Sequence, residues 1–227
     1  MIDLARDVST VIEATVLVVG ALFPIVNPLG SAAIFINMIG SGVEPKVHRA
    51  LTQKIAIYSF FLLIGSLLWG VKILTFFGIS IYAVQIGGGL LVAATGWSLL
   101  SQGTSGVGSK SLQDDNILDH AFYPYTLPIT IGPGSISVAV TVGAHLPAEV
   151  HASSFLSPEV LIAAIAGSVI ICLIIYICYR YANAAERLLG STGTAVVMRL
   201  CSFILMCIGV QILCTGVKDY LATIHFS

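Results

Sequence analysis

The stretch that decides the fold runs Phe23-Pro24-Ile25-Val26-Asn27-Pro28-Leu29-Gly30-Ser31, and a second stretch, 104 positions later, runs Leu127-Pro128-Ile129-Thr130-Ile131-Gly132-Pro133-Gly134-Ser135. Each holds two prolines followed by a glycine and a serine, near the middle of a long apolar segment. A proline lacks a backbone donor, clashes with the preceding helical turn, and pushes the residue before it away from helical angles. We therefore predict two broken membrane helices, whose first halves end near Phe23 and Leu127.

A second half-helix is expected to begin after each break. Asn27-Pro28 is typical of an N-cap followed by proline at the first helical position, and Gly132-Pro133 is a weaker form of the same signal. Broken backbone is tolerated in a membrane only inside protein or along a polar cavity. Free N–H groups at the new helix starts favour an anion or carboxylate, and unwound carbonyls favour a cation or ammonium group. The alternative is a pair of proline kinks with a packing role only.

The rest of the chain is strongly apolar. Of its 227 residues, 57% are hydrophobic and 9% are charged, whereas a typical soluble domain has about 25% charged residues. The net charge of −1 gives no argument for nucleic-acid binding. The cysteines lie in apolar runs and neither they nor the histidines have the spacing of a metal site, so no cofactor is expected. We expect an all-α membrane protein with one domain, residues 1–227.

Six stretches are apolar and long enough to cross a membrane, which takes about 20 residues. Their approximate bounds are 11–39, 55–77, 81–100, 122–145, 160–181 and 195–221. A polar linker, 102–120, separates two halves, residues 1–101 and 121–227. With six spans, the side away from the termini carries six Lys and Arg residues against three on the side of the termini. Both termini should therefore face outside.

The two halves match at several positions. Pro133 follows Pro28 by 105 positions, and small residues with a spacing of seven recur at an offset of 113, as Gly89, Gly96 and Gly103 and then Ser202, Gly209 and Gly216. Small residues at helical spacing allow close helix packing. Because three spans per half is an odd number, the second half must be inverted. We expect two inverted three-helix repeats, with spans one and four broken near the midplane.

Two polar residues lie near the starts of spans three and six. Gln85 and Arg199 are 114 positions apart, and each precedes a small residue by three, so that each polar group shares a face with a residue that packs inward. An intramembrane charge is costly unless it is paired or hydrated. Arg199 is also close enough to a helix end to extend to the interface, or to pair with Glu186. The candidate substrate-binding residues are Asn27, Pro28, Gly30, Ser31, Gln85, Thr130, Gly132, Pro133, Gly134, Ser135 and Arg199.

Taken in order, these motifs resemble the MarC family over nearly the whole chain. The first-repeat motif is similar at Asn27-Pro28-Leu29-Gly30 and Ile34-Phe35, and the second at Leu127-Pro128 and Gly132-Pro133-Gly134-Ser135-Ile136. Spans three and six are similar at Phe77-Gly78-Ile79-Ser80, Gln85-Ile86-Gly87-Gly88-Gly89, Arg199-Leu200 and Thr215-Gly216-Val217-Lys218. The resemblance implies a six-span inner-membrane protein whose characterised relatives move small neutral amino acids, some with sodium. Departures from the family pattern at Thr130, Ile131 and Ser202 bear on the substrate.

The residues and the resemblance together favour a secondary transporter or exporter of alanine- or glycine-like amino acids, coupled to sodium or protons and working by alternating access. Its expected partners are the lipid bilayer and a small zwitterionic solute, with a homo-oligomer left open. Alternatives are a channel, or a translocator of another small polar or lipid-linked solute. An enzyme is not expected, because Ser135 as a nucleophile would need a nearby base, and His145 and His151 lie at or beyond the far end of span four.

Overall fold

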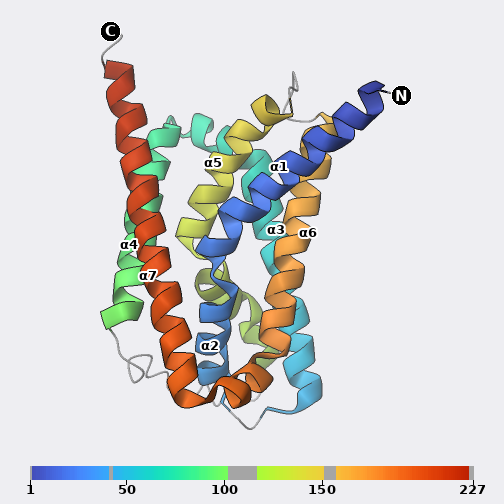
Figure 1. The fold of residues 1–227 in the computed structure, drawn as a ribbon, viewed down its shortest axis with the longest axis vertical. Helices are drawn as coiled ribbons and strands as arrows, with labels where there is room; N and C mark the ends of the chain where they lie inside the picture. Colours follow the sequence, from blue (N-terminus) through green and yellow to red (C-terminus); the bar gives the residue numbers. More distant parts are fainter. Residues whose placement is uncertain (1, 41–42, 102–116, 151–156, 225–227) are drawn as a thin grey trace.

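The computed structural model describes residues 2–40, 43–101, 117–150 and 157–224, and every regular element within these ranges is helical (Figure 1). The elements are, in order, α1 (Ile2–Val26), α2 (Pro28–Ile39), α3 (Pro45–Phe76), α4 (Ile81–Ser101), the 3₁₀ helix η1 (Ile117–Ala121), the π-helix η2 (Phe122–Thr130), α5 (Pro133–Glu149), α6 (Pro158–Arg180) and α7 (Ala182–Ile224). The predicted all-α architecture is confirmed.

The helices give five candidate membrane spans and one bent pair of helices. Five segments are long and apolar enough to cross a bilayer, with α1 and α2 counting as one. A sixth candidate is the pair formed by η1 and η2 with α5, which is bent by 69°. Figure 1 shows both chain termini at the same end of the molecule, as six crossings require. Large apolar side chains on the outside, among them Val16, Phe61, Trp97 and Leu173, are more than half exposed. They are suited to contact with lipid rather than water.

Helices α4 and α7 pack side by side along one flank of the molecule (Figure 1). The regularly spaced glycines explain how closely they approach. A Cβ atom on Gly89 would lie 2.5 Å from the Leu213 amide nitrogen, and one on Gly96 would lie 2.5 Å from that of Met206. The predicted packing role of these glycines is therefore confirmed, whereas Gly103 falls outside the described residues.

An aromatic cluster anchors the short half-helix α2. The fully buried ring of Phe35 lies 4.7 Å from the ring of Tyr179 on α6 and 5.5 Å from that of Tyr125 on η2. It also contacts the His48 ring of α3, with ring centroids 5.7 Å apart. Aromatic pairs of this kind contribute about 0.5–1.5 kcal/mol each beyond their burial. One side chain thus holds α2 against three neighbouring elements.

Several helix boundaries differ from those expected. α3 begins at Pro45 rather than near residue 55. Its first turns carry Lys46 and Arg49, so they lack the hydropathy by which a membrane span is predicted. α7 begins at Ala182 rather than near residue 195, with a break at Gly190, where φ is 66°. Of the expected linker, residues 117–120 belong to the 3₁₀ helix η1, and 102–116 lie outside the described part of the chain.

Candidate functional site

The break in span one lies at Asn27, and the predicted end near Phe23 is wrong. α1 continues past Pro24 to Val26, and the Asn27 amide still donates to the Phe23 carbonyl at 3.1 Å. A proline removes only the bond to the residue four positions before it, so one turn of helix survives beyond Pro24. At Asn27 the backbone turns left-handed, with φ 46° and ψ 61°. Because a right-handed helix needs a negative φ at every residue, α1 ends before this position.

Asn27 caps the helix that follows. Its side-chain Oδ1 accepts a hydrogen bond from the Gly30 amide at 3.3 Å, as predicted for an N-cap. Its carbonyl oxygen accepts from both the amide and the hydroxyl of Ser31, each at 2.9 Å. A Cβ atom on Gly30 would lie 2.9 Å from Asn27 Cγ. Gly30 therefore makes room for the cap.

The break in span four has a different construction. Leu127 is extended, with φ −111° and ψ 122°, as expected for the residue before Pro128. α5 starts at Pro133, and its N-cap, Gly132, has no side chain to offer. The amides of Gly134 and Ser135 in the first turn therefore have no acceptor within the helix. The positive end of α5 is open, whereas that of α2 is covered by Asn27.

A cavity of about 320 Å³ lies between the two breaks. Its walls include seven of the eleven candidate residues, namely Asn27, Ser31, Thr130, Gly132, Pro133, Gly134 and Ser135. Val92 on α4 and Leu205 on α7 supply apolar walls. Pockets for small molecules typically measure about 300–1,000 Å³ and combine such walls with a few polar groups. The tertiary structure thus brings the two proline motifs, more than 100 positions apart, to one cavity.

Three further candidates do not line this cavity. Gln85 is buried, and it lines a separate cavity of about 130 Å³ with Thr141, Gln211 and Thr215. Its Oε1 atom has no hydrogen-bond partner among the described residues. Pro28 and Gly30 are buried in the first turn of α2, where they shape the helix start without lining the cavity.

Arg199 does not reach the central cavity. It is exposed on α7, although Ser202, three residues later, is buried. Three residues of helix fall about 60° short of a full turn, enough to move a side chain off the inward face. Glu186 is the expected ion-pair partner of Arg199, and its side chain lies outside the described part of the structure.

Tyr179 belongs to this site although no sequence motif predicts it. Thr130 Oγ1 donates to the Tyr125 carbonyl at 2.7 Å, so the Tyr179 hydroxyl, also 2.7 Å away, donates to Thr130. Tyr179 is fully buried, and its ring lies 4.7 Å from that of Phe35 on α2 of span one. It therefore links the two broken spans behind the cavity. In the sequence, Tyr179 stands at the end of an apolar stretch beside Arg180. That position is typical of a tyrosine that anchors a helix at the membrane interface, and it does not indicate a buried site residue.

The histidines considered as bases for Ser135 do not form a site with it in the described structure. The His145 ring is exposed, and its Nδ1 atom lies 2.8 Å from the Thr141 carbonyl oxygen. His151 falls outside the described residues.

Comparison with known proteins places this chain in a family. Residues 12–221 match the family described as MarC family integral membrane protein. The chain is 29% identical over 211 residues to the UPF0056 inner membrane protein MarC of Salmonella typhimurium and 28% identical to that of Escherichia coli, covering 90% of this chain and 94% of each relative. Identity to the Salmonella arizonae protein is 30% over 217 residues, with the same coverage. No solved structure gives a significant match. The chain therefore belongs to the MarC family of integral membrane proteins, and it is a multi-pass protein of the inner membrane.

Proposed function

We propose that this protein is a secondary transporter or exporter of small neutral amino acids of the alanine and glycine class. The observation that carries the proposal is the cavity of about 320 Å³ between the breaks of spans one and four. Discontinuous helices in corresponding positions of two halves are the strongest pointer to a substrate site in secondary transporters.

The chemistry of the cavity suits a small zwitterion. A carboxylate can accept hydrogen bonds from the open amides of Gly134 and Ser135, at the positive end of α5. An ammonium group can be held by Asn27 and by carbonyl oxygens of the unwound backbone. The apolar surface of Val92 and Leu205 suits a hydrogen or methyl side chain. The opposite charges of the solute thus find different partners within one space.

The helix contacts support an arrangement of two inverted repeats. α4 packs against α5 as α7 packs against α2, and α1 packs against α6 as η2 packs against α3. In Figure 1, α2 occupies the half of the molecule away from the termini and α5 the half near them. Rocking of one repeat against the other would then open the cavity to each side in turn, driven by a sodium or proton gradient.

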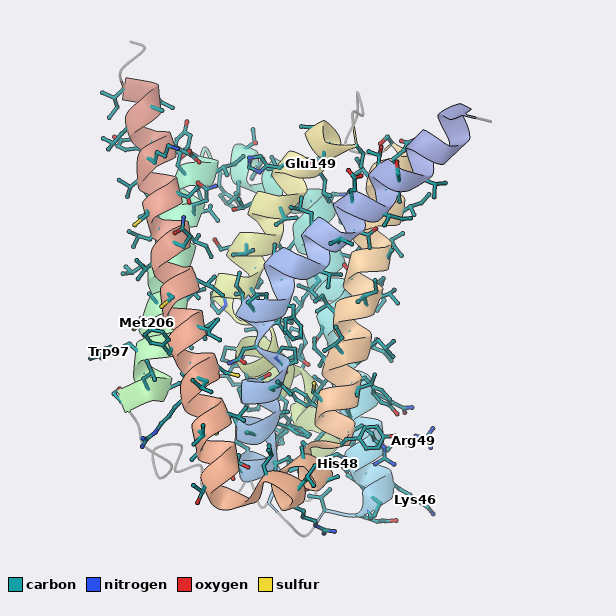
Figure 2. All side chains as sticks on the ribbon, viewed as in Figure 1. Lys46, His48, Arg49, Trp97, Glu149 and Met206 are labelled. Carbon is teal, nitrogen blue, oxygen red and sulfur yellow. The ribbon has the colours of Figure 1, made fainter. Side chains whose placement is uncertain are left out.

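The orientation in the membrane is part of the proposal. The end opposite the termini carries Lys46 and Arg49, as Figure 2 shows, and basic residues concentrate on the cytoplasmic side. Both termini would then face outside. Alkaline phosphatase fused to the C-terminus should be active in cells. An inactive fusion would indicate the opposite orientation, with both termini in the cytoplasm.

The test is uptake of labelled alanine and glycine by proteoliposomes, with and without a sodium or proton gradient. We expect saturable uptake above that of empty liposomes, abolished by Asn27→Ala. Asn37→Ala is the matched control, because Asn37 is an exposed asparagine on the same half-helix. Flux without saturation would favour a channel. Absence of saturable uptake of both amino acids would refute this substrate class.

A further inference from the structure

A second cavity, of about 580 Å³, lies where the start of α3, the end of α6 and the start of α7 meet. Its walls include Pro45 and His48 from α3, Arg180 from α6, and Arg187 from α7. Figure 2 shows His48, with Lys46 and Arg49, at the end of the molecule opposite the chain termini. This cavity is separate from the one between the helix breaks, and the proposed transport does not use it.

Two cationic side chains line the cavity. Arg180 and Arg187 contribute two guanidinium groups, and no acidic side chain among the described residues lines the space. Within the described part of the chain, neither arginine forms an ion pair or hydrogen bond with a side chain. The start of α3 adds the positive end of a 32-residue helix, whose N-cap residue is Glu44. Such a concave surface attracts an anion.

His48 adds an unpaired polar group to this wall. Its side chain is only 5% exposed, and its Nε2 atom has no hydrogen-bond partner among the described residues. Arg180 is close enough to interact with it electrostatically. Buried polar groups are normally paired, so this position calls for a further partner.

Part of the rim of the cavity is apolar. Tyr181 and Leu188 belong to its walls and are 63% and 88% exposed. Leu188 lies in the first segment of α7, which ends at Gly190 and runs across the end of the bundle in Figure 1. Exposed apolar groups beside basic ones at the end of a membrane bundle match the boundary between lipid headgroups and acyl chains.

We propose that this cavity binds a phosphate-bearing anion, and that its source is the headgroup of an anionic phospholipid. Guanidinium groups match phosphate oxygens in a two-pronged geometry, which makes arginine well suited to this group. Basic pockets between membrane helices on the cytoplasmic side are known to hold anionic headgroups. The apolar part of the rim, formed by Tyr181 and Leu188, favours a lipid over free phosphate, because it offers a surface to the acyl chains.

The test uses the purified, delipidated full chain in a neutral detergent. Phosphatidylglycerol, phosphatidylcholine and inorganic phosphate are titrated separately, with the unfolding temperature and native mass spectrometry as readouts. Phosphatidylglycerol should raise the unfolding temperature and bind at low stoichiometry. In the Arg180→Gln/Arg187→Gln variant its apparent affinity should fall about tenfold or more, the effect of losing a charged hydrogen bond. The control, Lys72→Gln/Lys218→Gln, removes two exposed cations near the other ends of α3 and α7 and should behave as the wild type.

Each remaining outcome decides the matter. A response to inorganic phosphate equal to that for phosphatidylglycerol, and lost in the arginine variant, would support the site and assign it to free phosphate. Equal binding of phosphatidylcholine, no response to any ligand, or binding that survives the loss of both arginines would overturn the proposal. If the double variant fails to fold, Arg187→Gln carries the test, because Arg187 is exposed.

Discussion

The hydroxyl groups of Thr130 and Tyr179 lie 2.7 Å apart and join η2 to α6 beside the central cavity. Thr130 also donates to the Tyr125 carbonyl, a backbone group in the irregular part of span four. The unwound backbone is therefore held by side chains rather than by a regular helix. This arrangement keeps the wall of the cavity in one geometry although it lacks ordinary helical bonds.

Removing the Tyr179 hydroxyl should loosen this wall. Tyr179→Phe is expected to lower the free energy of unfolding by roughly 0.5–1.5 kcal/mol, the range for a hydrogen bond between membrane helices. Unfolding in mixed detergent measures the change. Tyr176→Phe is the control, because Tyr176 lies on the same helix and has no hydrogen bond within the described structure. Since Thr130→Val removes the same bond, the double variant should lose less than the sum of both single losses, and full additivity would contradict the assignment.

The two roles of Asn27 can be separated by substitution. Asn27→Ala loses the cap and retains the cost of a left-handed residue, so a loss of about 1–3 kcal/mol in stability is expected. Asn27→Gly loses only the side chain, and should fold within a few tenths of a kcal/mol of the wild type because glycine accepts positive φ. If the side chain binds solute, both variants lose uptake. Normal uptake by the folded glycine variant would place the solute elsewhere.

Gly30 should be intolerant of a side chain. In Gly30→Ala the new Cβ would meet the Asn27 side chain, so the cap must move, and we expect a loss of about 1–3 kcal/mol together with reduced uptake. Gly20→Ala on α1 is the control, since its Cβ would meet no atom within 4 Å. Combining Gly30→Ala with Asn27→Gly should relieve the clash. A double variant as unstable as the sum of the single changes would show that the clash is not the cause.

The contact between α4 and α7 can be probed with two glycines of the same helix. Gly89→Ala should cost about 1–3 kcal/mol, because its Cβ would press on the Leu213 backbone, which cannot rotate away. Gly87→Ala should be neutral or stabilising, by up to about 1 kcal/mol, since its Cβ would enter open space and alanine favours the helix. Thermal unfolding in detergent compares the two. Equal effects would mean that close packing does not decide this contact.

Local chemistry explains which boundaries could be predicted. The second half-helices begin at Pro28 and Pro133 as expected, because a proline at the first helical position is a signal between neighbouring residues. The end of α1 could not be predicted from Pro24, because an interior proline removes one hydrogen bond and the helix can continue where the next residues keep theirs, as Asn27 does with the Phe23 carbonyl. The extra turns of α3 before residue 55 were missed for a related reason, since hydropathy reports membrane depth rather than helix length.

The site was predictable only in part. Both proline motifs predict broken helices, so the seven candidate residues that line the central cavity could be named from the sequence. The sequence could not show that Tyr179 is buried in the protein interior, nor that Arg199 is exposed on the surface. A tyrosine in an apolar run faces inward or outward according to the rotation of its helix, and that rotation depends on neighbours distant in sequence.

By itself the sequence determined that this protein crosses a membrane and where two of its helices break, because hydrophobicity and proline act over a few neighbouring residues. The tertiary structure alone decided that the two breaks share one cavity, that Tyr179 braces it and that Arg199 stays outside. It also decided that Arg180 and Arg187 line a second cavity with His48. These relationships join residues far apart in the chain, and they arise only when helices pack at defined rotations and depths.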